Sequence, residues 1–565
     1  MPMPEIRERE VDEAACARLV ASGVAPRMAR IYASRGLAEL GELATALAGL
    51  AAPDRLNNVA DAARLLADAI GRRERLLIVA DYDADGATAC AVGVKALRAM
   101  GATVDYLVPN RFEHAYGLSP EIVREAAKRS PQLLITVDNG IASHEGVAEA
   151  NRLGMRVLVT DHHLPAATLP DAACIVNPNQ GGCGFPSKHL AGVGVIFYVM
   201  LALRAELRRR GAFGSGSGPN LAEVLDLVAL GTVADVVRLD ANNRILVSQG
   251  LARIRAGRSC AGIAALLEVA GRDARRVTAY DLGFAAGPRL NAAGRLDDMS
   301  LGIACLLCED AAQAMALASQ LDRLNRERRE IEVEMQASAL AIVGEVPERD
   351  DYTLVLHSDA WHAGVVGLLA SRLKDRFNRP AFAFASDGAE NLKGSGRSIA
   401  ALHLRDALDL VDKRNPGMLV RFGGHAAAAG ATLRRSRLDE FRAAFEAVAR
   451  ELLTATDLQQ CIDTDGELAA DELTCELAET LRAQVWGQGF PEPRFAGRFR
   501  VESQKVVGER HLRLGLSCGG RRLSAIRFGS AEALPDEIHA VYRLDVNEFQ
   551  GASSLQLVIE HIASA

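Results

Sequence analysis

The chain has 565 residues, too many for one hydrophobic core, so several domains are expected. Hydrophobic residues make up 49% and charged residues 24%, which is typical of soluble globular proteins. The net charge of −7 excludes a chain that is basic throughout, so an anionic substrate must bind a local basic surface. No apolar run reaches about 18 residues, and the acidic start MPMPEIREREVDE resembles neither a signal peptide nor a transit peptide. We expect a cytoplasmic protein that does not enter a membrane.

The first 70 residues differ in pattern from those that follow. Residues 1–70 are rich in Ala and Leu at helical spacing, which predicts a helical N-terminal lead-in. From residue 71, apolar runs alternate with helical segments, and the runs lie in 76–80, 103–111, 132–140, 155–163 and 173–179. Such repeated strand–helix units predict a parallel sheet with helices on both faces.

The most informative segment is LLIVADYDADG, residues 76–86. Its apolar run lacks alternation and predicts a strand buried on both faces, followed by Asp81, Asp83 and Asp85. Ligands of open α/β sheets bind beyond the carboxyl ends of the strands. Three neighbouring carboxylates repel one another unless a cation neutralises them, and hard divalent ions take oxygen ligands. The alternative is a turn whose Asp side chains cap the next helix.

More acids and histidines follow the later strands. The third strand ends at Asp138, the fourth at Asp161, His162 and His163, and helical LAEVLDLVALGTVADVV leads to Asp235. Each of these side chains alone is more often a structural hydrogen-bonding group, but together they predict a metal site at one sheet edge. Carboxylates with one or two imidazoles suit Mn²⁺ or Mg²⁺ better than zinc. Two such ions would clamp a phosphoryl group while activating the attacking water.

The motifs DYDADG, VDNG, DHH and GTVADVV resemble, in this order, those of the DHH phosphoesterase superfamily. The whole chain resembles the RecJ family of single-strand-specific exonucleases. This resemblance implies a metal-ligand set of Asp83, Asp85, Asp138, His162 and Asp235. It places His163 beside the metals, as a ligand or as an acid, base or phosphate contact, and so in the catalytic set. Asp81 and Asp161 would orient the ligands from behind, with Asp81 as an alternative ligand.

Two further segments resemble DNA-contacting stretches of the same family. In PNRFEHAYGLSP (109–120), the resemblance implies that Arg111 contacts the 5′ end and Tyr116 the first base; the alternative is a solvated loop. In GPRLNAAGRLDD (287–298), it implies phosphate binding by Arg289, Asn291 and Arg295. The alternative there is a Gly-rich turn with incidental arginines.

A long helix and a second α/β unit are expected next. Residues 301–345 show helical spacing and predict a connecting helix, whose charges Arg323, Arg326, Arg328 and Arg329 form a solvated face or line a DNA path. The motifs KGSGRSI (393–399) and FGGHAAAAG (422–430) resemble the DHHA1 domain. The resemblance implies that this domain contacts the DNA strand through Ser395, Arg397 and His425, with His362 and Arg372 nearby. His357, His403 and His511 are expected to be structural.

The last part of the chain consists of short alternating strands with Gly turns and predicts an OB-fold β-barrel. Its arginines and aromatics suit single-strand binding, although alternating Phe residues are also ordinary core. They are Arg498, Arg500, Arg513, Arg521, Arg522 and Arg527 with Phe499, Phe528 and Phe549. The expected fold class is therefore multidomain α/β: lead-in 1–70, DHH domain 71–300, connecting helix 301–345, DHHA1 domain 346–455 and OB-fold domain 456–565.

The resemblance implies a 5′→3′ exonuclease on single-stranded DNA, with two Mn²⁺ or Mg²⁺ ions and 5′-mononucleotide products, acting in recombination and repair. Residue spacing alone indicates only metal-assisted phosphodiester hydrolysis. The alternative is a DHH phosphodiesterase on nanoRNA or cyclic dinucleotides, although such chains usually lack a terminal barrel. A non-catalytic DNA-binding scaffold would not keep every ligand. Family habit implies single-stranded DNA with a 5′ end, a single-strand-binding protein and a RecQ-type helicase as partners, and we expect a monomer.

Overall fold

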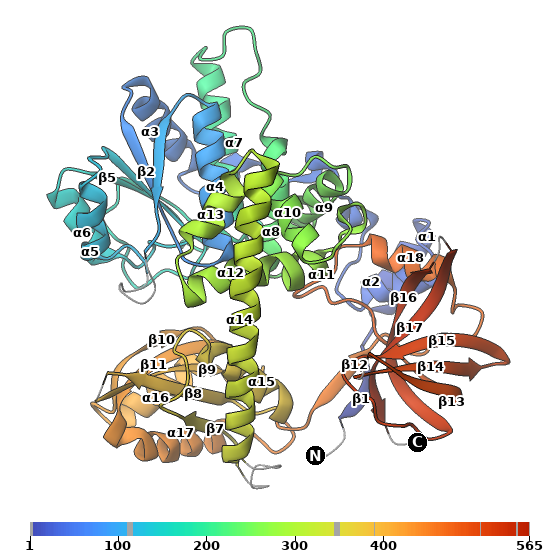
Figure 1. Ribbon diagram of the computed structural model, residues 1–565. Coiled ribbons are helices and arrows are strands. Elements are labelled where there is room, and N and C mark those ends of the chain that lie inside the picture. The colour runs from blue at the N-terminus through green and yellow to red at the C-terminus, as the bar shows by residue number, and fades with distance from the viewer. Residues whose placement is uncertain are drawn as a thin grey trace.

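The computed structural model describes residues 4–109, 117–343, 351–388, 390–508, 510–549 and 552–563. It has two α/β lobes, a long helix that runs between them, and a β-barrel at one side, near both chain termini (Figure 1). This arrangement confirms the predicted fold class. In the described part of the chain, no helix is long and apolar enough to cross a membrane.

The first lobe is built on a five-stranded sheet with the strand order β3-β2-β4-β5-β6, in which all neighbours are parallel. The strands are β2 (Arg75–Ala80), β3 (Thr103–Leu107), β4 (Leu133–Val137), β5 (Arg156–Thr160) and β6 (Cys174–Val176). Ile78 of β2 packs into the hydrophobic cluster on one face, and Leu77 and Val79 pack into the cluster on the other. The strand is therefore buried on both faces, as its unbroken apolar run predicts.

Helices cover both faces of this sheet. One face packs against α5 (Pro120–Ala127) and α6 (His144–Arg152). The other face packs against α3 (Val59–Gly71), α4 (Ala84–Ala99) and α7 (Gly192–Arg209). Beyond this layer lie α8 (Leu225–Ala234), α9 (Ala241–Arg255), α10 (Ala261–Val269) and α11 (Ala279–Asp281).

The segment GPRLNAAGRLDD is helical, so the alternative of a Gly-rich turn is wrong. It forms α12 (Gly287–Leu296), which follows one turn of π-helix, η6 (Leu282–Ala286). A Cβ atom on Gly294 would lie 1.9 Å from the carbonyl oxygen of Tyr82. Gly294 therefore allows α12 to pack closely against the DYDADG segment. The local sequence alone does not show whether a glycine serves such packing or a turn.

The predicted connecting helix is two helices. They are α13 (Ser300–Leu307) and α14 (Ala311–Val343), and Asp310 begins the second by accepting a hydrogen bond from the Gln313 amide at 2.7 Å. With 33 residues, α14 is about 50 Å long at 1.5 Å per residue. It runs from the first lobe to the second (Figure 1). All ten cysteines are free thiols.

The second lobe has a mixed sheet with the order β10-β11-β9-β8-β7, in which only β7 and β8 are parallel neighbours. Its strands are β7 (Leu354–His357), β8 (Ala381–Asp387), β9 (Asn391–Arg397), β10 (Leu419–Gly424) and β11 (Ala428–Arg434). Its helices are α15 (Val366–Phe377), α16 (Leu404–Arg414) and α17 (Leu438–Leu452). A Cβ on Gly394 or Gly396 would lie within 2.4 Å of a ring atom of Phe384 or Phe382. The glycines of KGSGRSI thus let β9 lie against a buried aromatic layer.

The N-terminal segment is more than the predicted helical lead-in. Besides α1 (Glu13–Ala21) and α2 (Pro26–Ala33), it contains β1 (Glu5–Glu8), which pairs in parallel with β12 (Cys461–Thr464). Arg35 and Asp465 form a buried ion pair at 2.6 Å, and the rings of Tyr32 and Trp486 stack with centroids 6.3 Å apart. These contacts attach the barrel to the body of the first lobe.

The C-terminal part is a closed five-stranded barrel, as predicted, with the order β13-β14-β15-β17-β16. Its elements are α18 (Cys475–Ala483), β13 (Phe495–Val507), β14 (His511–Cys518), β15 (Arg521–Arg527), β16 (Glu537–Phe549) and β17 (Ala552–Ala563). Phe499 is buried in the core, whereas Phe528 is 58% exposed. The side chain of Phe549 lies outside the described residues. Of the described phenylalanines considered for DNA binding, only Phe528 presents its ring to solvent.

Candidate active site and metal centre

Three of the predicted acids lie side by side at the carboxyl edge of the first sheet. Ala80 of β2 pairs with Val137 of β4, and Val137 pairs with Thr160 of β5. The residues that follow these three are Asp81, Asp138 and Asp161. Parallel register thus brings three acids that are far apart in sequence to one edge, as the strand–helix pattern predicts.

Asp83 and Asp85 lie at the start of α4. Asp83 is the N-cap and accepts a hydrogen bond from the Gly86 amide at 3.0 Å. For Asp83, the alternative that an Asp side chain caps the next helix is therefore correct. Asp85 is different, because it points toward α7 and accepts the amides of Gly192 and Val193 at 2.5 and 2.8 Å. The start of α7 therefore holds the Asp85 carboxylate in place.

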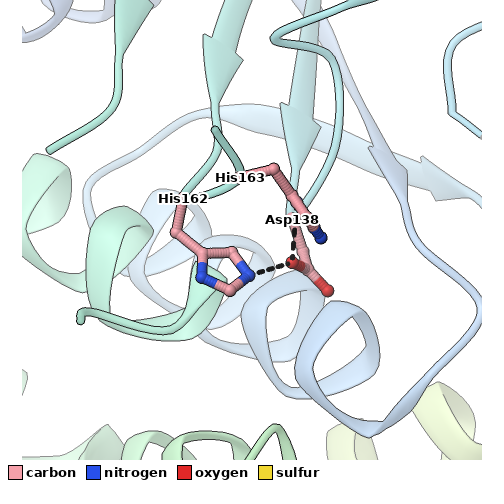
Figure 2. A group of neighbouring side chains, drawn as sticks. All are labelled: Asp138, His162 and His163. Carbon is pink, nitrogen blue, oxygen red and sulfur yellow. Dashed lines mark ion pairs between the residues drawn. The ribbon is translucent and has the colours of Figure 1, made fainter. Parts of the chain in front are cut away.

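The ring of His162 points into the carboxylate cluster. Its Nε2 lies 3.0 Å from Asp138 Oδ1, 3.5 Å from Asp235 Oδ2 and 3.9 Å from Asp85 Oδ2. Figure 2 shows how His162 and His163, from the turn after β5, converge on Asp138. Three overlapping groups have potential ligand atoms within 4.8 Å of one another: Asp138–His162–His163, Asp85–His162–Asp235 and Asp81–Asp83–Asp138.

Asp161 does not point into this cluster, because its carboxylate is used to hold the DHH turn. It accepts hydrogen bonds from the backbone amides of Ile141, His162 and His163 at 2.9, 2.7 and 3.1 Å. It also lies 2.8 Å from Nδ1 of His163. This placement agrees with the predicted orienting role. Asn177 and Asn179 hold the same turn by donating side-chain hydrogen bonds to its carbonyl oxygens. Sequence reasoning missed both.

The backbone is strained at one predicted ligand and directly after another. Asp138 has a φ of 62°, in the left-handed region that non-glycine residues avoid. Val236, directly after Asp235, has a φ of 61° and is 63% exposed. Such conformations persist where the surrounding structure imposes them, and they cluster at functional sites.

Burial and mutual repulsion disfavour the charged form of the clustered carboxylates. Burial, followed by the charge of Asp83, raises the pKa of Asp85 to about 7, despite the two amides that it accepts. Burial and the charge of Asp85 likewise raise the pKa of Asp138 and of Asp235 well above the ordinary value. Without a cation, burial and repulsion favour the protonated form of these groups, whereas a cation would favour their ionised form.

The surroundings shift the pKa values of the two histidines in opposite directions. Burial, together with the charge of His163, lowers the pKa of His162 to about 4, so its ring is neutral and can bind a metal. Burial also acts to lower the pKa of His163, but its hydrogen bond to Asp161 and the surrounding acids outweigh that effect and raise the value to about 9. Burial acts to raise the pKa of Asp161, but the hydrogen bond and the charge of His163 outweigh it and keep the value below the ordinary one.

The donor set fits divalent metal ions. Nε2 of His162 and Oδ2 of Asp235 are buried and form no hydrogen bond with a described residue. Buried polar atoms without a partner are costly, and a cation between them would provide one. Oxygen-rich ligands with one imidazole suit Mn²⁺ or Mg²⁺.

The second lobe brings two of its predicted groups toward this cluster. The ring of His425, at the turn between β10 and β11, stacks on that of His163 with centroids 6.0 Å apart. His362 lies in a segment that contacts α12, because a Cβ on Gly364 would be 2.2 Å from the carbonyl oxygen of Arg295. Arg295 also donates to the Gly364 carbonyl at 3.3 Å.

Ser395 and Arg397 lie together on β9. The Arg397 guanidinium donates to the Ser395 hydroxyl at 2.9 Å, and both side chains face the start of α15 at Gly367. Asn291 instead faces the metal loop and accepts a hydrogen bond from the Ala84 amide at 2.8 Å. It helps to fix the first turn of α4, a role that sequence reasoning missed.

The structure does not support the predicted phosphate contact of Arg289. Its guanidinium is buried and forms an ion pair with Asp322 of α14 at 2.8 Å, and it also donates to the Ala285 carbonyl. The guanidinium therefore ties α12 to α14. Arg372 pairs with Glu332 of the same helix at 2.7 Å, although its side chain remains 57% exposed.

The described residues do not place the remaining predicted DNA contacts near the carboxylate cluster. Arg111 and Tyr116 lie outside the described residues. On α14, Arg326 pairs with Asp322 and its side chain is 67% exposed, as expected for a solvated face, whereas Arg328 is buried against Glu332. His357, His403 and His511 have the expected structural surroundings: an ion pair with Asp359, a helix N-cap and a turn amide.

Three family models match the chain in its order of domains. The DHH family, N-terminal domain, matches residues 75–232, the DHHA1 domain 350–451 and the RecJ OB domain 464–561. The single-stranded-DNA-specific exonuclease RecJ of Dickeya dadantii (strain 3937) is 55% identical over 94% of this chain and 95% of its own length. The chain belongs to the RecJ family. RecJ of Escherichia coli (strain K12) is 52% identical over 99% of both chains.

Solved RecJ structures share the fold of the whole chain. RecJ from Thermus thermophilus in complex with Mn²⁺ has a TM-score of 0.82 and 30% identity, covering 99% of this chain and 79% of that one. Its complex with Mg²⁺ has a TM-score of 0.76. Together with the acidic clusters of this chain, these relatives indicate divalent metal use.

Proposed function

We propose that this RecJ-family protein degrades single-stranded DNA from its 5′ end by hydrolysis that depends on two divalent ions, and releases 5′-mononucleotides. The observation that carries the proposal is the convergence of Asp85, Asp138 and Asp235 on the buried Nε2 of His162. A cluster of this composition favours phosphoryl-transfer chemistry.

The residues divide into two overlapping sets. Asp85, His162 and Asp235 would hold one ion, and Asp83 and Asp138 the other, with Asp81 and His163 close by. When bound, such ions supply Lewis-acid chemistry that lowers the pKa of water and offsets the charge of the scissile phosphate. Asp138 belongs to more than one group and would be shared.

The chain's own contribution is to hold these groups in position. The amides of Gly192 and Val193 fix Asp85, and Asp161 fixes the DHH turn. His163, whose pKa is raised through Asp161, would donate a proton to a phosphate oxygen or to the departing 3′ oxygen. His425 faces it from the second lobe and would bind the strand from the opposite side.

Strandedness and polarity are inferred from family membership. Arg397 and Ser395 would contact the backbone, and Arg111 and Tyr116 the 5′ end. The barrel arginines would add non-specific contacts to the backbone. Binding to a single-strand-binding protein and a RecQ-type helicase, and a monomeric state, belong to the same proposal.

The deciding experiment is a product assay on single strands labelled at the 5′ or the 3′ end, with Mn²⁺, with Mg²⁺ and with a chelator. We expect a 5′ label to appear at once as mononucleotide, and a 3′ label to pass through shortening fragments. Double-stranded DNA of the same sequence is the control. Cleavage of a dinucleotide in preference to the long strand would favour the nanoRNA phosphodiesterase alternative and contradict the proposal.

A further inference from the structure

An exposed pair of aromatic rings lies outside the residues already assigned. Tyr280 of α11 and Phe284 of η6 are 51% and 64% exposed. Their rings stack on each other with centroids 4.6 Å apart and an interplanar angle of 24°. Large aromatic side chains usually bury most of their surface, so a stacked pair in solvent indicates a binding surface.

The pair is attached to the helix that carries a predicted metal ligand. Glycines of the segment around Phe284 allow η6 and α12 to lie against the last turn of α8: Cβ atoms on Gly283 and Gly287 would be 3.1 Å from side-chain atoms of Val233 and Ala234. The next residue along α8 is Asp235. The π-helical turn itself is a rare conformation that is frequent at functional sites.

The same segment also contacts the barrel. Arg276, four residues before Tyr280, forms an ion pair with Glu548 of β16. Figure 1 shows α11 on the side of the first lobe that faces the barrel. The ring pair therefore lies between the contact with the barrel and the helix that ends at Asp235.

The surroundings of the pair are rich in arginine, and each of these arginines has an acidic partner: Asp281 for Arg272, Asp273 for Arg275, Glu548 for Arg276 and Asp322 for the buried Arg289. Residues 270–290 contain four arginines and two aspartates. Arg272 and Arg275 are 47% and 82% exposed in their side chains, and each is also paired with an aspartate. Exposed rings among arginines suit a polymer with aromatic bases and phosphates better than an apolar protein segment.

We propose that Tyr280 and Phe284 form a stacking platform for bases of the single-stranded substrate, downstream of the end that is cleaved. The platform rests on the proposed function, since the strand must reach the metal cluster at its 5′ end. It binds bases without sequence preference, because every base has a π-face. The exposed Arg272 and Arg275 would contact the backbone as the strand passes from the barrel toward the metal cluster.

The test compares Phe284→Ala, Tyr280→Ala and the double variant with the unchanged protein. Binding of a 20-nucleotide oligothymidylate, labelled at its 3′ end and measured by anisotropy with chelator, should weaken on the order of tenfold for each lost stack. With metal, KM for this strand should rise by a similar factor, whereas kcat and the cleavage of a trinucleotide should not change. Leu40→Ala, an equally exposed apolar position in the N-terminal segment, is the matched control.

Two further variants separate stacking from simple apolar contact. Phe284→Trp should retain binding, and Phe284→Leu, which keeps apolar area without a π-face, should lose it. Unchanged binding in the double variant, full binding by Phe284→Leu, or an equal loss on the trinucleotide would each overturn the platform. These outcomes are distinct from a failure of the proposed function, in which the unchanged protein would not degrade the single strand at all.

Discussion

The two α/β lobes position their polar side chains by different means. In the first lobe, the acids follow parallel strands, where they are buried at one sheet edge and held by backbone amides. In the second lobe, Ser395 and Arg397 lie on the face of the antiparallel strand β9, half exposed, and His425 lies at an exposed turn. Buried charges of one sign need a cation, whereas half-exposed groups among small residues can meet a polymer. On the proposed function, the first lobe would therefore hold the metal ions and the second would contact the substrate.

The largest effect is expected from removing a shared carboxylate of the first lobe. Asp138→Ala should lower kcat about 10³-fold, because one metal-dependent stabilisation of several kcal/mol is lost. Calorimetric titration with Mn²⁺ should show fewer bound ions. The melting temperature of the metal-free protein should not fall, since the change removes a repelled, buried charge.

Asp226→Ala is the matched control for this comparison. Asp226 is also fully buried, but it accepts the amides of Leu227 and Cys260 and is not in the cluster. Its loss should lower the melting temperature and leave the metal stoichiometry unchanged. Full activity of the Asp138 variant would contradict the assignment of the cluster.

An intermediate effect is expected from the second lobe. His425→Ala should lower kcat/KM about 10- to 100-fold through the loss of one charge-assisted or polar contact to the strand. The number of bound Mn²⁺ ions should stay the same. His403→Ala, in the same lobe but at the N-cap of α16, should keep its activity. Loss of bound metal in the His425 variant would contradict the assignment of metal binding to the first lobe and substrate contact to the second.

The pH dependence of stability should also distinguish the lobes. The folded-state pKa of Asp85 is raised to about 7, so the metal-free folded protein binds more protons than the unfolded chain between about pH 4 and 7. Its stability should therefore fall as the pH rises through that range. We expect the melting temperature of the chelated protein to drop by several degrees from pH 5 to pH 7, and Mn²⁺ to remove the drop. A flat profile in chelator would show that the acids are not repelled.

The smallest effect concerns the support of the metal loop. Asn291→Ala removes the acceptor for the Ala84 amide and should cost about 1 kcal/mol of stability, as the loss of a helix cap does. Because the first turn of α4 carries Asp83 and Asp85, activity should fall several-fold at limiting Mn²⁺ and recover at high Mn²⁺. Asn220→Ala, which removes a similar cap at η4 (Leu221–Val224), should change stability only slightly and leave the Mn²⁺ dependence unchanged.

Part of this site could be predicted because it depends on local patterns. An apolar run followed by acids marks a buried strand and its carboxyl end, and parallel register places Asp81, Asp138 and Asp161 side by side. The same reasoning cannot tell that Asp161 faces the turn while Asp85 faces the cluster. That difference depends on which amides reach each carboxylate, and the amides that fix Asp85 lie more than 100 residues away.

The predictions from residue type alone were less reliable. An arginine in GPRLNAAGRLDD suggests phosphate binding, yet Arg289 is paired with Asp322 on a helix that begins 22 residues later. The glycines of the same segment suggest a turn, yet Gly294 permits close helix packing. The local sequence identifies neither Asp322 as the partner of Arg289 nor the Tyr82 carbonyl as the group packed against Gly294.

The sequence by itself determined the order of the domains, the strands of the first sheet and the acids and histidines that gather at its edge, since periodicity and strand ends are local properties. Only the tertiary structure decided which amides hold Asp85 and Asp161, the pairing of β1 with β12, and the attachment of the barrel through Arg35 and Asp465. These contacts join residues from 20 to more than 400 positions apart, so their energy depends on the folded packing and has no counterpart in any single stretch of the chain.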